Sequence, residues 1–185
     1  MVSVSFYLMS TDKRLIKKAQ RGEVEAFGTL YDEYLTPIYS FVLLRVRHKS
    51  DAEDITQQVF LNAWKNIERY ELRNNIPFSS WLYRIARNAV IDHYRTQREH
   101  VDIESLSEQL SANVPEPAQI LDDTFQLKEV KRALNALGAD EQDVLIMRFI
   151  NELSSKEVAD VLDKSEGAVR VVQHRALKKL KRELD

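Results

Sequence analysis

Two short helical patterns around a tight turn, over residues 154–184, constrain the fold of this chain more than any other stretch. Ser154-Ser155-Lys156-Glu157 fits a capping box that opens the first helix. The turn Asp163-Lys164-Ser165 follows, and Ser165 is a suitable N-cap for the second helix. At about 100° per residue, the second helix places Val169, Val172, Ala176, Leu177, Leu180 and Leu184 on one side, and Arg170, His174, Arg175, Lys178, Lys179, Lys181 and Arg182 on the other.

The outer face of this second helix is strongly basic. From Lys164 to Arg182 the chain has seven Lys and Arg residues and one acid, Glu166. A short helix, a turn and a helix with a cationic outer face are typical of insertion into a DNA major groove. The alternative is an ordinary amphipathic helix whose basic face is only solvated. The pattern favours DNA binding over that alternative, but it specifies no target sequence.

The net charge of −2 hides an uneven distribution. Residues 1–98 have 15 basic and 11 acidic side chains, residues 99–127 have seven acids and no Lys or Arg, and residues 128–185 have 12 basic and 11 acidic side chains. The acid is therefore concentrated in the middle, and the whole-chain charge does not argue against a nucleic-acid partner.

The absence of cysteine excludes a disulfide framework, a thiolate metal site and a cysteine nucleophile. No apolar run approaches the ~20 residues of a membrane span. We therefore expect a cytoplasmic protein without stable membrane insertion. Met9-Ser10-Thr11-Asp12-Lys13 resembles a natural beginning, so we expect residues 1–8 to be a misassigned start or an appended sequence.

The first half of the chain reads as a series of core-forming helices. We predict a helix over residues 12–21 ended by Gly22, a second over 23–35, and a third with Thr36 as its cap and Pro37 in its first turn. After a turn at residues 48–49, a capping box beginning at Ser50 is expected to open a helix to about Tyr70. The apolar side of that helix contains Ala52, Ile55, Val59, Phe60, Ala63, Trp64 and Ile67.

A loop over residues 70–77 precedes a helix predicted from Phe78 or Ser79 to Arg98. Trp81, Leu82, Ile85, Ala86, Ala89 and Val90 cover one side, and Arg84, Arg87, Asn88, Arg95 and Arg98 cover the other. Such a stripe beside a loop with Tyr70 and Phe78 suits a DNA strand, whose phosphates meet guanidinium groups and whose bases meet rings. The alternative places the aromatic rings in the core and the arginines in solvent, and for Trp81 that alternative is preferred.

Residues 99–125, with Pro115, Pro117 and only acids among the strong charges, read as an extended linker. Helices over 127–137, closed by Gly138, and over 140–150 then complete a small four-helix domain with the pair described first. The fold class is therefore all-α, with two small helical domains joined by an acidic linker.

Several stretches together resemble the extracytoplasmic-function (ECF, group IV) RNA polymerase sigma factors. They are 19–23 (AQRGE) with 26–34, 51–60 (DAEDITQQVF), 81–88 (WLYRIARN), and the helix-turn-helix with 167–170 (GAVR) and Arg175-Ala176. The resemblance covers nearly all of residues 10–185 and preserves the order of every motif. It implies sigma region 2 over 1–98, the linker over 99–125, and sigma region 4 over 126–185.

The resemblance also implies partners and site residues. Core RNA polymerase would be bound by Asp51, Asp54, Gln57, Gln58 and Leu61. The minus-ten promoter element would be bound and melted by Tyr70, Phe78, Arg84, Arg87, Asn88 and Arg95, with Asn88 in a polar base pocket. The minus-thirty-five element would be bound by Arg170, Val171, His174, Arg175 and Lys178, with Val171 near a thymine methyl. The linker would follow the polymerase channels, and an anti-sigma factor linked to stress is common in the group.

Two other functions would fit parts of the sequence. A stand-alone helix-turn-helix regulator explains the C-terminus but leaves the faces of residues 51–61 and 84–98 without a role. An enzyme is disfavoured because His48, His93, His100 and His174 have no metal-ligand spacing and the four glycines form no phosphate-binding loop. We therefore expect no catalytic residue, no metal and no cofactor.

Overall fold

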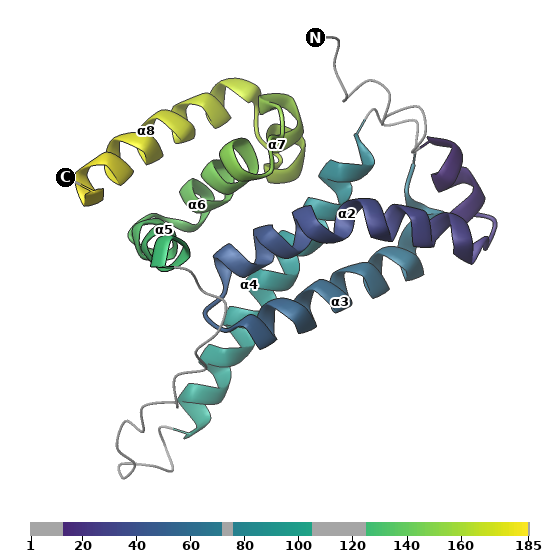
Figure 1. Ribbon diagram of the computed structural model, residues 1–185, viewed down its shortest axis with the longest axis horizontal. Helices are drawn as coiled ribbons and strands as arrows, with labels where there is room; N and C mark the ends of the chain where they lie inside the picture. The colour runs from purple at the N-terminus through teal and green to yellow at the C-terminus, as the bar shows by residue number, and fades with distance from the viewer. Residues whose placement is uncertain (1–12, 72–75, 105–124, 185) are drawn as a thin grey trace.

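The computed structural model describes residues 13–71, 76–104 and 125–184, and this part of the chain is helical without a strand (Figure 1). A short helix over residues 13–19 ends before Gly22, whose φ of 87° is the left-handed value that favours glycine. The remaining elements are α2 (Val24–Arg45), α3 (Lys49–Asn66), η1 (Ile67–Arg69), α4 (Phe78–Glu104), α5 (Phe125–Asn135), α6 (Ala139–Leu145), η2 (Ile146–Ile150), α7 (Ser155–Leu162) and α8 (Glu166–Leu184).

Helices α2, α3 and α4 form the first bundle. Its core contains the apolar side predicted for α3, with Ala52, Val59 and Ala63 fully buried. The ring of Phe41 meets that of Tyr83 edge-on, with 5.5 Å between centroids. Burial of one stripe from each helix explains why moderate helical propensity suffices here.

Two predicted helix starts in this bundle are wrong. Pro37 lies inside a continuous α2 and does not begin a new helix capped by Thr36. A proline cannot donate the helical hydrogen bond, but Ile38, Phe41 and Val42 are fully buried on the following turn, and this packing keeps the two halves in one helix. Ser50 is likewise not a cap: α3 begins at Lys49, with His48 in the N-cap position and no side-chain cap bond.

Helix α4 is longer than predicted and continues through Glu104 instead of ending at Arg98. The first six residues expected to belong to the linker are therefore helical. The rest of that stretch up to residue 124, and the expectation about residues 1–8, lie outside the described residues.

Helices α5 to α8 form the second group. The capping box of α7 is confirmed: Ser154 Oγ accepts the Glu157 amide at 3.2 Å, and Glu157 Oε2 accepts the Ser154 amide at 2.8 Å. Asp163 makes the turn with a φ of 53°, and Ser165 Oγ accepts the Ala168 amide at 3.2 Å. The helix predicted over 140–150 is α6 continued by the single π turn η2.

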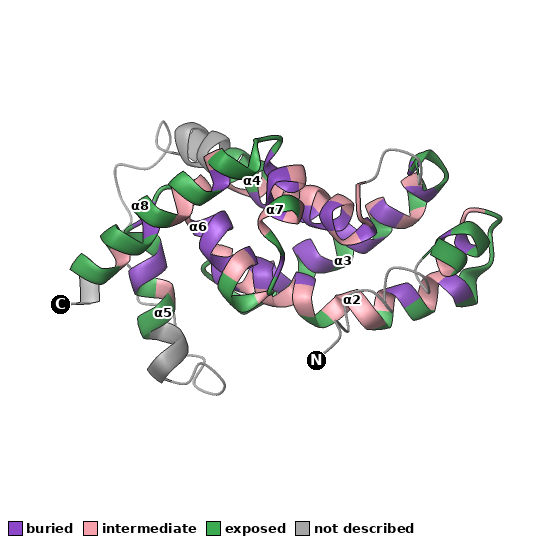
Figure 2. Ribbon diagram, turned by 90° about the horizontal axis from the view of Figure 1, so that it is seen from above, coloured by how far each residue is buried: buried purple, intermediate pink, exposed green. Residues whose placement is uncertain are grey.

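The two groups touch. Helices α6 and α7 face α2 and α4, whereas α8 lies on the far side of the second group (Figures 1 and 2). This placement leaves the outward side of α8 exposed along most of its length. Within the described ranges, no helix combines the length and apolar character that a bilayer span requires.

Candidate nucleic-acid interface

Helix α8 presents the basic face that the sequence predicts. Val169 and Ala176 are fully buried against the rest of the second group. The five residues predicted to read DNA are all exposed, and Val171 keeps 49% of its surface. Those five are Arg170, Val171, His174, Arg175 and Lys178. Leu177, predicted on the core side, is instead 40% exposed, because it lies at the edge of an apolar groove formed with α5 and η2.

One lysine of the basic face has a partner within the protein. Lys179 Nζ lies 2.8 Å from Glu141, whose Oε2 also accepts the Gly138 amide at 3.0 Å. These two contacts lower the pKa of the Glu141 carboxyl against a small opposing effect of burial. The ion pair of Lys179 with Glu141 therefore connects α8 to the start of α6.

The outer face of α3 is polar and open. Asp54, Gln57, Gln58 and Leu61 are exposed, and Leu61 keeps 53% of its surface. Asp51 is half-buried, and its Oδ2 lies 3.4 Å from His93 Nε2 on α4. The predicted polymerase-binding residues thus share one side of α3, with an exposed leucine among polar groups.

The structure places Tyr70 and Phe78 differently from the sequence prediction. Tyr70 is 7% exposed and Phe78 is 3% exposed, and their rings meet at 5.5 Å in a cluster that includes Tyr34 and Trp81. Buried rings cannot stack on a DNA base in this conformation, so that part of the prediction is corrected. Tyr70 also donates a 2.7 Å hydrogen bond to the Ile76 carbonyl, which positions the two ends of the loop.

Two open hollows flank Trp81 on the surface of the first bundle. One, of about 310 Å³, is lined by Arg69, Tyr70, Glu71, Ile76, Trp81 and Arg84. The other, of about 500 Å³, is lined by polar groups that include Asn62, Asn66, Arg69, Asn88 and Asp92. Asn88 is exposed and faces the second hollow, and exposed Arg95 pairs with Asp92 at 3.3 Å.

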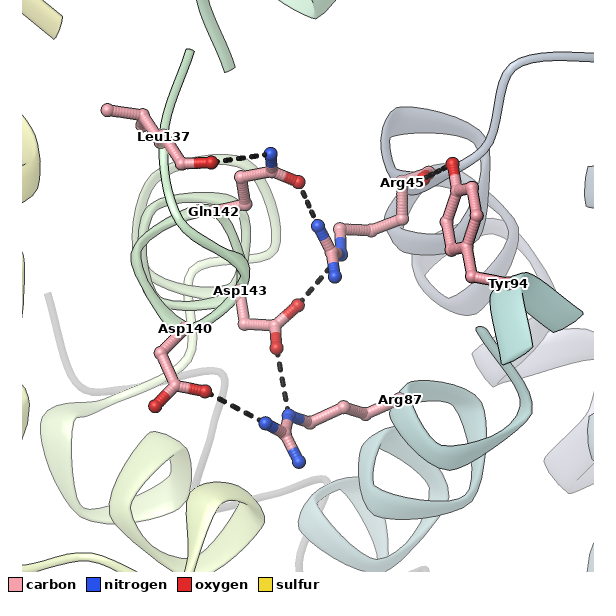
Figure 3. Close-up of polar contacts among 7 residues, drawn as sticks. All are labelled: Arg45, Arg87, Tyr94, Leu137, Asp140, Gln142 and Asp143. Atoms are coloured by element: carbon pink, nitrogen blue, oxygen red, sulfur yellow. Dashed lines mark hydrogen bonds and ion pairs between the residues drawn. The ribbon is translucent and has the colours of Figure 1, made fainter. Parts of the chain in front are cut away.

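Arg84 and Arg87, the centre of the predicted stripe, contact the second group of helices. Arg87 Nε lies 2.8 Å from Asp143 Oδ2, and Arg87 Nη2 lies 2.8 Å from Asp140 Oδ1 (Figure 3). Arg84 donates to the Asp160 carbonyl on α7. No pattern in the sequence predicts these contacts, because partners that lie 53 to 76 positions apart follow no helical spacing.

A third arginine, Arg45 on α2, completes the contact. Arg45 Nε lies 2.9 Å from Asp143 Oδ1, and Arg45 also donates to the Gln142 side chain (Figure 3). The side chains of Arg45 and Asp143 keep only 7% and 1% of their surface. Burial raises the pKa of Asp143, and Arg45 and Arg87 oppose that rise. One carboxylate is therefore held between guanidinium groups from two different helices.

Comparison with known proteins identifies the family of both groups of helices. Sigma-70 region 2 matches residues 30–100, and sigma-70 region 4 matches residues 133–182. The ECF RNA polymerase sigma factor BldN of Streptomyces coelicolor is 36% identical over 170 residues, which cover 91% of this chain and 64% of that protein. The ECF sigma factor SigW of Bacillus subtilis is 31% identical, with 93% of this chain and 96% of SigW covered.

Among solved structures, CnrH in complex with the cytosolic domain of CnrY has a TM-score of 0.74 and 26% identity, over 95% of this chain and 97% of that chain. A region 2 bundle followed by a region 4 helix-turn-helix defines a sigma factor, a transcription initiation factor and not an enzyme. The chain belongs to the ECF RNA polymerase sigma factors. A stand-alone helix-turn-helix regulator does not account for the region 2 match.

Proposed function

We propose that this alternative sigma factor uses three separate surfaces to start transcription. The outer face of α3 binds core RNA polymerase, the α4 stripe with its neighbouring hollows binds the minus-ten element, and the basic face of α8 binds the minus-thirty-five element. Residues 1–98 bind the polymerase and melt the minus-ten DNA, residues 126–185 bind the minus-thirty-five element, and residues 99–125 connect these two parts. The proposal rests mainly on one observation about α8: Val169 is buried, whereas all five residues predicted to contact DNA are exposed.

For the upstream element, Arg170 and Arg175 supply hydrogen bonds to base edges or phosphates. His174 lies beside them, and the exposed Val171 can meet a thymine methyl in the major groove. Lys178 lies one turn beyond His174, where an ammonium group neutralises a phosphate without reading sequence. Arg170 is paired with Glu166 at 3.1 Å in the free chain, an exposed pair that DNA can exchange at little cost.

For the downstream element, Asn88 supplies amide hydrogen bonds to an extruded base, and Arg84, Arg87 and Arg95 neutralise the adjoining phosphates. Unstacking a base step costs a few kcal/mol, so a hollow that holds the extruded base shifts the equilibrium toward open DNA. Tyr70 and Phe78 support this site indirectly, because their rings pack against Trp81 beside the hollows.

Core RNA polymerase contacts the outer face of α3 at Asp51, Asp54, Gln57, Gln58 and Leu61. We place the protein in the cytoplasm, where the polymerase works. Regulation by an anti-sigma factor, a protein that binds the sigma factor in place of the polymerase, is supported by the similarity to CnrH bound to the cytosolic domain of CnrY.

Transcription with purified core polymerase tests the proposal. Arg170→Ala and Arg175→Ala are expected to weaken binding to the upstream element by about 1–3 kcal/mol each where the residue contacts a base. Lys17→Ala, an exposed charge loss on the other module, is the control. Equal transcription from promoters with and without that element would contradict the assignment.

Polymerase binding is tested separately. Asp54→Arg and Gln58→Ala are expected to lower the affinity for core polymerase, because both side chains are exposed on the proposed contact face. Asp32→Arg on α2 is a matched control, since Asp32 is an exposed acid outside that face. Unchanged affinity of folded Asp54→Arg and Gln58→Ala proteins would overturn this surface.

A further inference from the structure

The contact between the two modules covers part of the α4 face that is proposed to bind the minus-ten element: Arg84 and Arg87 are engaged, whereas Asn88 and Arg95 stay exposed. Four α4 residues within three turns contact region 4. Ser79 Oγ lies 3.2 Å from Glu157 Oε1, and Ser80 Oγ donates to the Glu157 carbonyl at 3.3 Å. Arg84 donates to Asp160, and Arg87 donates to Asp140 and Asp143. Helix α7 therefore lies along α4, and region 4 occupies Arg84 and Arg87, which are proposed to bind phosphates of the DNA strand.

The groups that meet the two arginines resemble those of a DNA backbone. Carboxylate and carbonyl oxygens of region 4 accept the guanidinium hydrogen bonds that phosphate oxygens would accept. Asp143 does so while almost fully buried, and its second oxygen is bound by Arg45. Asp140 continues the chain of charges, since its second oxygen lies 3.2 Å from Lys164.

On the far side of region 4, no residue that the structure describes forms such an obstruction. The reading residues of α8 are exposed in the same arrangement. The closed form, defined as the arrangement with Arg45 and Arg87 bound to Asp143, thus occupies Arg84 and Arg87, two of the proposed phosphate contacts for the minus-ten element, and leaves the proposed reading residues of α8 exposed (Figures 1 and 3).

We propose that region 4 is an internal competitor for minus-ten DNA, with Asp140 and Asp143 held by Arg45 and Arg87 as the autoinhibitory contact. This inference rests on the proposed role of the α4 face in minus-ten binding. The free sigma factor then engages the upstream element but not the downstream one. Binding to polymerase selects the open form, which releases Arg84 and Arg87 to the DNA.

Removing one partner opens the contact instead of unfolding a domain. Without the Asp143 charge, Arg45 and Arg87 would remain desolvated and uncompensated, an unfavourable state that separation of the modules relieves by admitting water. Phe41 and Val59 are buried within region 2, and Val144 and Val169 within region 4, although all four belong to one apolar cluster that continues across the contact. Helical content should therefore persist while the distance between the modules grows.

The chain has no cysteine, so two introduced thiols give unambiguous labels. Asp32→Cys on α2 and Lys181→Cys on α8 replace exposed residues of the two modules. Distances between the labels are measured by energy transfer, and binding of single-stranded minus-ten DNA to the free full-length chain is measured by anisotropy. Asp143→Asn removes the charge at constant size, and Asp163→Asn is the matched control, an exposed acid in a left-handed turn that asparagine tolerates.

We expect Asp143→Asn to lengthen the label distance and to raise the minus-ten affinity at least tenfold, with Asp163→Asn indistinguishable from the wild type. Arg45→Met repeats the test from region 2 without altering a proposed DNA contact, and circular dichroism confirms that each variant is folded. If the wild-type distance is already long, or if both folded variants match the wild type in distance and DNA affinity, the autoinhibitory contact is refuted.

A separate result would overturn the underlying role of α4. If an opened Asp143→Asn chain, alone and with core polymerase, binds minus-ten DNA no better than unrelated DNA, the α4 assignment fails whatever the label distance shows. Adding Arg87→Ala to Asp143→Asn should lower the affinity of the opened chain, because the guanidinium group then acts only on DNA.

Discussion

Arg87 Nε lies 2.8 Å from Asp143 Oδ2, which joins α4 of region 2 to α6 of region 4 across 56 positions of sequence. The other end of the same guanidinium group reaches Asp140 at 2.8 Å. A planar group with donors on two edges can hold two carboxylates at once, whereas an ammonium group concentrates its charge at one point.

This geometry predicts a graded response at position 87. Arg87→Lys should keep the charge but lose one of two charge-assisted hydrogen bonds, each contributing about 1.5–3 kcal/mol, and Arg87→Ala should lose both. The radius of gyration from small-angle scattering is expected to increase from wild type to Lys to Ala. An Arg87→Ala chain as compact as the wild type would contradict this order.

Substitution of Leu61 should change the affinity for core polymerase without a large change in the free energy of unfolding. Because it is 53% exposed, Leu61→Ala should change the unfolding free energy by less than about 0.5 kcal/mol. Polymerase affinity should fall by about 1 kcal/mol, or roughly fivefold, if the leucine is an apolar contact among polar ones. Val24→Ala, at a 69% exposed valine on α2, is the control and should leave both quantities unchanged.

The cap of α7 should contribute measurably to region 4. Ser154→Ala removes the acceptor of the Glu157 amide and is expected to cost about 0.5–2 kcal/mol in urea denaturation. Ser155→Ala changes the adjacent serine, which starts α7 but is not its cap, and should have little effect. Equal stability of the two variants would mean that the cap contributes nothing.

Substitution of Tyr83 by phenylalanine should not lower the stability of the protein, in contrast to Ser154→Ala. Its hydroxyl is buried without a hydrogen-bond partner among the described residues, and burial together with the nearby Glu157 charge raises its pKa. Because an unsatisfied hydroxyl costs about 1–3 kcal/mol, Tyr83→Phe should be neutral or stabilising by up to about 1 kcal/mol in thermal unfolding. A clear destabilisation would show that the hydroxyl has a partner, such as an ordered water.

The loss of region 4 stability at acidic pH should depend on Glu141. Its pKa in the folded protein lies below the ordinary 4.5, chiefly because Lys179 and the Gly138 amide bind the charged form. A lowered folded pKa gives stability that is present above pH 4.5 and is lost as the pH falls through the folded value. In the Glu141→Gln protein, the melting temperature should therefore fall less steeply below about pH 4.5 than in the wild type. An equally steep fall would show that Glu141 does not contribute to the loss of stability in acid.

Local pattern was sufficient for much of the fold. The helix-turn-helix, its Ser154 and Ser165 caps and the buried side of α3 follow from periodicity and capping chemistry over a few residues. Where prediction failed, tertiary contacts outweighed a local signal. Pro37 is kept within α2 by the buried residues after it, and Tyr70 and Phe78 are drawn into an aromatic cluster that includes Tyr34 on another helix.

The sequence by itself determined the two helical modules, the exposed basic face of α8 and the exposed polar face of α3, because side chains three or four positions apart share a helix face in any fold. Only the tertiary structure decided what Arg84 and Arg87 contact. Their partners come from helices more than 50 positions away, and an arginine stripe has the same local pattern whether it meets phosphate, water or the carboxylates of its own chain.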